Sequence, residues 1–106
     1  MSDKNQYTFK PETAIEIVKE SIVSRILYKD EAVNVTLFGF DEGQALTEHT
    51  ASKPAIVQIL HGEATLTLNG EVKEASAGAW LYMSPGLAHA IAAKTPLVML
   101  LTLLNL

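Results

Sequence analysis

The sequence contains no cysteine in its 106 residues. This absence excludes disulfide bonds, thiol nucleophiles and cysteine-based metal clusters, and it is compatible with a reducing compartment. Clusters of basic residues are also missing, because the eight lysines and arginines are scattered between Lys4 and Lys94. A nucleic-acid interface needs a concentrated positive face to neutralise phosphates, so we expect no nucleic-acid partner.

Long apolar runs are absent as well. The longest run, Leu97 to Leu104 with Thr102 inside it, is far shorter than the roughly 20 residues that a transmembrane helix needs. The N-terminal residues Met1 to Gln6 are polar and do not resemble a signal peptide. Acidic and basic residues are interspersed, with a formal net charge of −4. We therefore expect a soluble, cytoplasmic protein with no membrane partner.

What the chain does contain is a series of short apolar or alternating segments separated by turn residues. Apolar residues make up 48% of the sequence, and this pattern predicts an all-β sandwich or barrel, folded as one domain over residues 1–106. The clearest local signal is Asn69-Gly70, which suits a type I′ hairpin with positive φ at both residues. From residue 33 onward, the predicted strands cover 33–40, 46–50, 55–60, 65–68, 71–74, 78–83 and 97–104, with 89–93 as a candidate for one more.

Residues 12–29 fit two interpretations. Thr13 and Glu16 mimic a helix capping box, and apolar residues follow at helical spacing. The same segment is rich in β-branched residues, which favour a pleated surface. We predict two short strands, at about 14–18 and 22–28, with a helix as the alternative.

The second half of the chain is organised around residues 78–89. An apolar run with partial alternation ends abruptly at Ser84-Pro85-Gly86, and a histidine follows three residues later. Alternation indicates a strand, and Pro-Gly indicates a tight turn. This turn would direct His89 toward whatever the inner face of the strand encloses.

These residues, taken with an earlier histidine, resemble the two motifs of the cupin superfamily, which consists of small β-barrels. The matching positions are Gly43, His49 and Gly62 for the first motif, and Gly78, Pro85, Gly86 and His89 for the second. The resemblance covers roughly residues 32–104. It implies a single-domain double-stranded β-helix of the jelly-roll type, with residues 32–106 as the core and 1–31 as an N-terminal arm and strands.

The sequence departs from the family pattern at the metal ligands. Cupins that bind metal usually use three histidines and one glutamate. Here the second histidine position falls on Ala51 and the glutamate position falls on Ala55, which leaves His49 and His89. Imidazole suits divalent iron, nickel, copper or zinc, but catalytic sites usually keep three protein ligands.

Gln58 and His61 are the candidates for a third ligand. By strand alternation His61 shares the face of Ala55, although it lies at the end of its strand and fits an exposed turn residue better. Gln58 points to the other face and reaches the interior only if a bulge shifts the alternation. It is otherwise a polar residue satisfied by a neighbouring strand or an interface.

The predicted interior is mostly apolar. Leu81 and Met83 should face inward with His89, and the alanines at 51 and 55 leave space there, so we expect a pocket for a small organic ligand. A core repacked around these alanines is the alternative. The candidate pocket residues are His49, Ala51, Ala55, Gln58, Leu81, Met83 and His89.

Two functions follow from this set. The first is a small-molecule-binding protein of unspecified ligand, weakly catalytic or non-catalytic. The second, which the resemblance implies, is a metal-dependent enzyme such as a dioxygenase, isomerase or sugar-processing enzyme. It would use His49, His89 and a non-standard third ligand to hold iron, nickel, copper or zinc. We favour the first, because half of the usual ligand set is missing.

Trp80 and Tyr82 are expected to face outward from the strand that carries Leu81. Residues 1–11, with Tyr7 and Phe9, are either an arm that pairs with a sheet edge or a loose segment. Cupins commonly dimerise by sheet packing and strand exchange, so the resemblance implies a homodimer. The alternative is that residues 1–28 cover this face within one chain.

Overall fold

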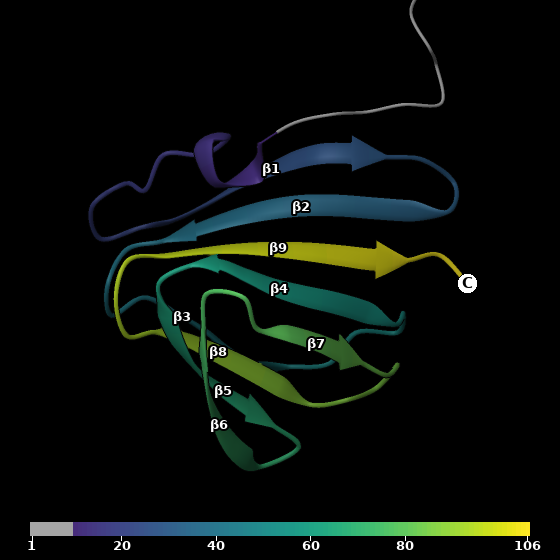
Figure 1. Ribbon diagram of the computed structural model, residues 1–106. Coiled ribbons are helices and arrows are strands. Elements are labelled where there is room, and N and C mark those ends of the chain that lie inside the picture. The colour runs from purple at the N-terminus through teal and green to yellow at the C-terminus, as the bar shows by residue number, and fades with distance from the viewer. Residues whose placement is uncertain (1–9) are drawn as a thin grey trace, which may run out of the picture.

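The computed structural model describes residues 10–106, which form nine strands after one short helical turn (Figure 1). The elements are η1 (Pro11–Thr13), β1 (Ile22–Lys29), β2 (Val33–Phe40), β3 (Ala45–His49), β4 (Ala55–His61), β5 (Glu63–Leu68), β6 (Glu71–Ser76), β7 (Trp80–Met83), β8 (His89–Ala93) and β9 (Leu97–Leu104). Within the same residues, no helix has the length and apolar character that crossing a membrane requires.

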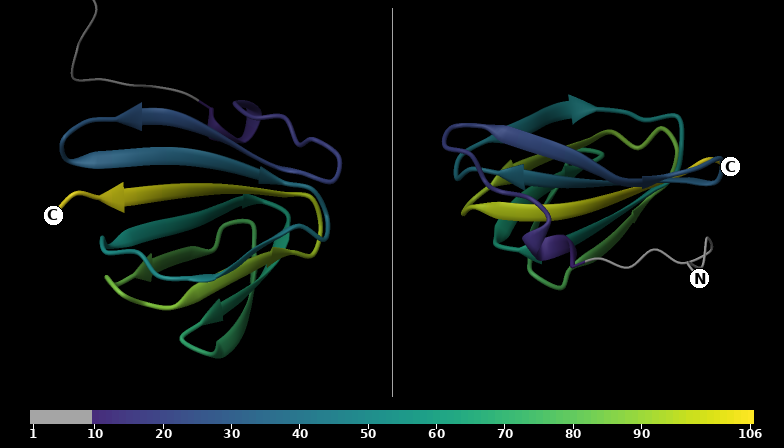
Figure 2. Two further views of the ribbon diagram at one scale, coloured as in Figure 1. Left: turned by 180° about the vertical axis from the view of Figure 1, so that it is seen from behind. Right: turned by 90° about the horizontal axis from the view of Figure 1, so that it is seen from above.

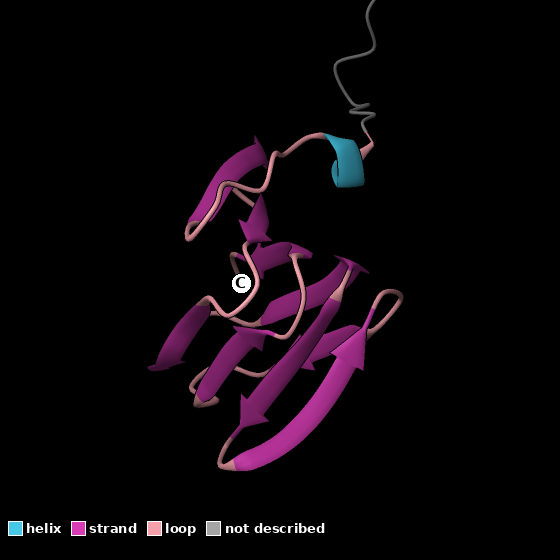
Figure 3. Ribbon diagram, turned by 90° about the vertical axis from the view of Figure 1, so that its left-hand side faces the viewer, coloured by secondary structure: helices cyan, strands magenta, loops and turns pink. Residues whose placement is uncertain are grey.

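The strands form two antiparallel sheets that face each other (Figure 1, Figure 2). One sheet has five strands in the order β1-β2-β9-β4-β7, and the other has four in the order β3-β8-β5-β6. Neighbours in each sheet are often distant in sequence, since β9 lies between β2 and β4. The predicted all-β, jelly-roll architecture is therefore confirmed, and Figure 3 shows how little of the described chain is helical.

The main core lies between the two sheets. The five-stranded sheet contributes alternate residues of its central strands, such as Val57, Leu97 and Met99, and the four-stranded sheet contributes Leu66 and Ile91. This alternation is what places one face of each strand in the interior. Burial of each large apolar side chain stabilises the fold by about 1.5–3 kcal/mol.

The Asn69-Gly70 hairpin is confirmed. Asn69 has φ 50° and Gly70 has φ 83°, the positive values that a type I′ turn requires. The flanking strands pair in register, with Leu68 opposite Glu71 and Thr67 opposite Val72. Local sequence alone therefore sets this part of the four-stranded sheet.

The prediction of a strand at 14–18 is wrong, and so is the helix alternative. Residues 14–18 pair with no strand of the described chain. Instead, Ile15 and Ile17 lie on the outer face of the five-stranded sheet and pack against a second apolar cluster that includes Leu37 and Val98. The β-branched side chains of this segment cover an apolar face without strand pairing. High β-propensity reflects packing of such side chains as much as backbone pairing, and for this reason it wrongly predicted a strand here.

Two further strand predictions are confirmed, and the predicted arm falls mostly outside the described residues. The strand at 22–28 is confirmed as β1. The strand at 97–104 is confirmed as β9, and both of its faces are covered, one by the main core and the other by the outer cluster. The predicted arm that carries Tyr7 and Phe9 lies almost wholly outside the described residues.

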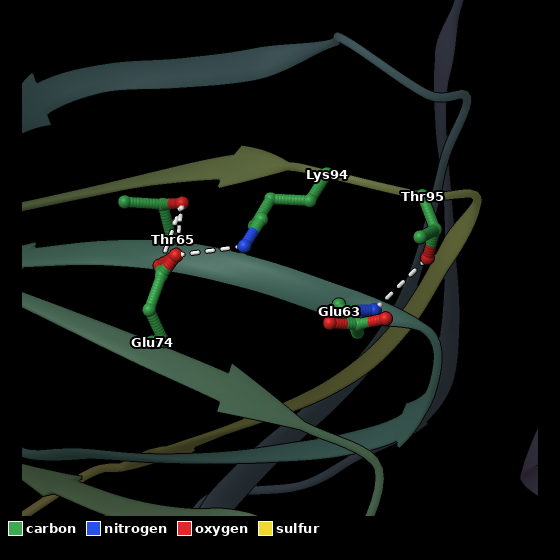
Figure 4. Close-up of polar contacts among 5 residues, drawn as sticks. All are labelled: Glu63, Thr65, Glu74, Lys94 and Thr95. Carbon is green, nitrogen blue, oxygen red and sulfur yellow. Dashed lines mark hydrogen bonds and ion pairs between the residues drawn. The ribbon is translucent and has the colours of Figure 1, made fainter.

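A polar cluster ties the β5–β6 hairpin to the segment that follows β8 (Figure 4). The Glu74 carboxylate accepts hydrogen bonds from Lys94 Nζ at 3.0 Å and from Thr65 Oγ1 at 2.9 Å. These bonds, the one from Lys94 first, lower the pKa of Glu74, and Glu74 in turn raises the pKa of Lys94. The stabilisation is lost as pH falls through the lowered pKa of Glu74 or rises through the raised pKa of Lys94, and solvent exposure keeps it small.

Gly62, the last glycine of the first motif, is enclosed on the side where a side chain would project. It has φ +88°, and a Cβ there would overlap the carbonyl oxygen of Pro96 and lie 2.8 Å from Thr95 Oγ1. Gly43 has a similar φ of +84°, but a Cβ there would meet nothing within 4 Å. The two glycines thus share a backbone conformation and differ in their surroundings.

We predict that Gly62→Ala lowers the free energy of unfolding by at least about 3 kcal/mol, since it combines left-handed strain with a clash against backbone. Gly43→Ala is the matched control and should lose only about 1 kcal/mol, from the strain alone. Urea denaturation of both variants measures the difference. Equal losses would contradict the close approach of residues 62 and 96.

Candidate functional site

The structure brings the two motif histidines together. His49 in β3 and His89 in β8 are direct cross-strand partners. Their ring centroids are 4.1 Å apart, and the ring planes meet at 62° in an edge-to-face arrangement. Side chains of directly opposed residues in an antiparallel pair lie on the same face of the sheet. The two imidazoles therefore form one site, although 40 positions separate them in sequence.

A β-bulge creates this pairing. The register of β3 against β8 shifts between Leu46 and His49, because Leu46 pairs with Ile91 while His49 pairs with His89. Three positions of β3 are thus matched by two of β8, which leaves one extra residue in β3. In an unbulged ladder Glu48 would oppose His89, and His49 would point to the opposite face.

Each imidazole is held by the backbone of its own segment. His49 Nδ1 lies 2.9 Å from the carbonyl oxygen of Thr47, and His89 Nδ1 lies 2.8 Å from that of Leu87. A carbonyl oxygen can only accept a hydrogen bond, so Nδ1 carries the proton in both rings. In the neutral ring Nε2 then carries a lone pair. No residue of the described chain is hydrogen-bonded to either Nε2.

The histidines line a cavity of about 100 Å³ between the two sheets. Its other walls are hydrocarbon or thioether side chains, so the two imidazoles are its only polar side chains within residues 10–106. The full lining is Phe38, Leu46, His49, Val57, Leu66, Leu68, Leu81, Met83, His89, Ala90, Ile91, Met99 and Leu101.

Four of the seven residues proposed from the sequence line this cavity, and three do not. His49, Leu81, Met83 and His89 belong to the lining, whereas Ala51, Ala55 and Gln58 do not.

Each of the three has a definite place elsewhere. Ala51 lies beyond the end of β3, where its carbonyl oxygen accepts a hydrogen bond of 2.8 Å from the amide of Gly86. Ala55 is 2% exposed and packs within the main core. Gln58 pairs with Trp80, whose side chain faces outward, so it lies on the outer face of the sheet. The small residues at 51 and 55 therefore do not form the cavity.

Most residues of the cavity wall were not predicted from the sequence. Phe38, Val57, Leu66 and Met99 lie in strands whose alternation marks an inward face. That signal identifies residues that point inward. It does not tell which of them face empty space, because this depends on how side chains of the opposite sheet fill the interior.

The residues around the cavity do not fit the metal centre that the resemblance implied. His61 is exposed at the end of β4 and lines a separate outer groove with Ile15 and Ile17. With Gln58 also on the outer face, neither candidate supplies a third ligand. Among residues 10–106, no group of three or more histidine, aspartate or glutamate side chains could hold a metal ion. Two imidazoles fall short of the three ligands usual at a catalytic metal.

Comparison with known proteins identifies relatives of similar fold. A family model described as a cupin domain matches residues 36–103. A conserved protein of unknown function from Streptococcus pyogenes is 26% identical with a TM-score of 0.85, and the match covers 98% of this chain and 91% of that one.

A cupin superfamily protein from Desulfitobacterium hafniense is 27% identical with a TM-score of 0.85, over 93% of this chain and 92% of that one. An RmlC-like cupin from Desulfovibrio desulfuricans is 23% identical with a TM-score of 0.80, over 99% of this chain and 97% of that one. At this identity the match supports a shared fold and nothing more specific. The comparison with curated proteins found no match.

We predict that the neutral forms of His49 and His89 are both the Nδ1–H tautomer, because each Nδ1 donates to a carbonyl oxygen. Long-range ¹H–¹⁵N correlation spectra of the imidazoles distinguish a protonated ring nitrogen from one that carries a lone pair. His61, exposed on the outer surface, is the internal reference. An Nε2–H signal from either cavity histidine would show that its backbone hydrogen bond is not formed.

Proposed function

The chain belongs to the cupin domain family, and we propose that it binds a small, mostly apolar organic molecule between its two sheets, with weak or no catalytic activity. The observation that carries this proposal is an apolar cavity whose polar side chains are the paired imidazoles of His49 and His89. A largely apolar pocket with a few convergent polar groups is the usual form of a small-molecule site.

The volume of the cavity limits the size of the ligand. An engineered cavity of about 150 Å³ lined by apolar residues stays dry and binds benzene. The cavity here is about 100 Å³, so by that comparison its enclosed part holds roughly four carbon atoms. His49, which lines the cavity, is exposed to solvent, so a five- or six-carbon ring can fit with one edge at this opening. A polar end of the ligand would meet the histidines.

The chemistry of the lining argues against efficient catalysis. General acid–base catalysis needs a donor and an acceptor placed on either side of the reacting group, each with a suitable pKa. No carboxylate, hydroxyl or amine side chain of the described residues joins the two imidazoles in the cavity. Two imidazoles held in the same tautomer can both accept a hydrogen bond from a ligand, but they do not form the donor–acceptor pair that acid–base catalysis needs.

A metal-dependent enzyme is the second candidate. Its support is the pair of side-by-side imidazoles, each with Nε2 free of hydrogen bonds to the described residues. Iron, nickel, copper and zinc all accept imidazole ligands. The donor set contains no third side chain, however, and so we assign no reaction step to a metal.

We predict that benzene binds in the cavity and shifts the ¹³C methyl resonances of Met83 and Met99, which line it. Leu66→Trp should abolish these shifts, because the larger side chain fills the space. Val72→Trp is the control, since Val72 is 64% exposed on β6.

Two results would overturn this proposal. One is the absence of saturable shifts in the folded wild-type protein. The other is stoichiometric retention of Fe(II), Ni(II), Cu(II) or Zn(II) after dialysis of the untagged protein, lost in both His49→Ala and His89→Ala. The second result would favour the metal-dependent enzyme.

A homodimer is the proposed assembly, and the outer face of the five-stranded sheet supports it. Trp80 and Tyr82 are 60% and 48% exposed on the edge strand β7. Their cross-strand partners are Gln58 and Ile56, so none of these four side chains carries a charge. An uncharged aromatic surface can pair with its own copy without like-charge repulsion.

Replacement of Trp80 and Tyr82 together by lysine should convert the dimer to a monomer, because charges would then meet across the two-fold axis. Light scattering at micromolar concentration gives the mass of each species. Val72→Lys, on an exposed strand of the other sheet, should leave the mass unchanged. A monomeric mass for the wild-type protein would refute the assembly.

A further inference from the structure

Resting on the proposed binding function, we infer that the ligand is a neutral molecule with a hydrogen-bond-donating end, a small alcohol being the simplest case. The cavity should select it over ketones and carboxylates of the same size. Three features of the site lead to this assignment: where the imidazole protons lie, what else lines the cavity, and which charges are missing from it.

The proton on each imidazole is committed to the backbone. His49 donates from Nδ1 to the Thr47 carbonyl at 2.9 Å, and His89 donates from Nδ1 to the Leu87 carbonyl at 2.8 Å. Both acceptors lie two residues before the histidine, so each bond is local and orients the ring. Nε2 lies on the far side of the ring from Cβ and is the nitrogen that a lining side chain can present to a ligand. In the neutral ring this atom accepts hydrogen bonds and cannot donate them.

Apart from the histidines, the described residues that line the cavity offer no side-chain donor. Its other members are aliphatic, phenylalanine or methionine side chains. A ligand hydroxyl can donate to Nε2 and so replace a hydrogen bond that it loses to water. A ketone or ether oxygen finds no side-chain donor in the described lining, so the protein does not replace the hydrogen bond that this oxygen makes with water. The direction of the hydrogen bond therefore discriminates between molecules of equal shape.

The lack of charged side chains among the described lining residues disfavours two further classes of ligand. Among residues 10–106, no lysine or arginine lines the cavity, so a carboxylate would enter an apolar space without a cation from these residues to pair with it. No aspartate or glutamate of the same residues lines the cavity either, which disfavours an ammonium group for the same reason. Glu48, the carboxylate nearest in sequence to the pair, is absent from the lining because the bulge in β3 places His49 inward in its stead.

Cyclopentanol, cyclopentanone and cyclopentanecarboxylate form a matched probe set, with the same five-membered ring and a different polar end. Each is titrated into ¹³C-methyl-methionine-labelled protein at pH 8, above the ordinary pKa of an imidazole. Met83 and Met99 are the reporters. We expect cyclopentanol to bind about 3- to 10-fold more tightly than cyclopentanone, as one net hydrogen bond provides. The carboxylate should show no saturable shift.

Two substitutions test whether the histidines cause the selectivity. His49→Phe and His89→Phe each keep a flat ring and leave one imidazole acceptor, so each alone should lower the alcohol-to-ketone ratio only in part. The two substitutions combined remove both acceptors and should bring the ratio close to one while cyclopentanone still binds. His61→Phe, outside the cavity, should keep the wild-type ratio. If a cavity variant fails to fold, the comparison of cyclopentanol with cyclopentanone in the wild-type protein still tests the inference.

The outcomes separate this inference from the proposed function. Binding of benzene with equal affinities for the alcohol and the ketone, or with the carboxylate as the tightest ligand, would overturn the inference and leave the binding function intact. Failure of benzene and all three probes to bind would overturn both. Selectivity for cyclopentanol that survives when both phenylalanine substitutions are combined would also overturn the inference, since the imidazoles would not be the acceptors.

Discussion

The site depends on one extra residue in β3. The bulge between Leu46 and His49 places His49 opposite His89 and excludes Glu48 from the lining. Because side chains alternate along a strand, a single-residue shift exchanges the inward and outward sets beyond it. The same irregularity therefore accounts for the paired imidazoles and for the absence of a carboxylate beside them.

The polarity of the cavity follows from that arrangement. Two local hydrogen bonds to the carbonyls of Thr47 and Leu87 orient the rings, and the remaining walls are apolar. The alanines at the positions of two family ligands do not enlarge this space, since Ala55 packs in the core and Ala51 lies beyond the strand. These features support the proposed hydrogen bonding with a neutral ligand.

The outer face of the five-stranded sheet is divided into two parts. Residues 14–17 cover the part around Leu37 and Val98, which explains how β9 can be apolar on both sides within one chain. The part that carries Trp80 and Tyr82 stays exposed. The cover by residues 14–17 is therefore observed over Leu37 and Val98 and not over Trp80 and Tyr82, for which it was the sequence-based alternative. Cover of Trp80 and Tyr82 by a second copy is a proposal.

Local patterns in the sequence determined the strands, the Asn69-Gly70 hairpin and the two motifs that carry His49 and His89, because alternation and turn chemistry act over a few neighbouring residues. These patterns did not reveal that residues 14–18 cover the outer face of the sheet, because β-branched residues are suited both to a paired strand and to an apolar packing contact. The bulge, the cavity wall and the place of Gln58 were decided only by the tertiary structure. Each depends on the register between strands distant in sequence, and on which opposing side chains leave space between the sheets.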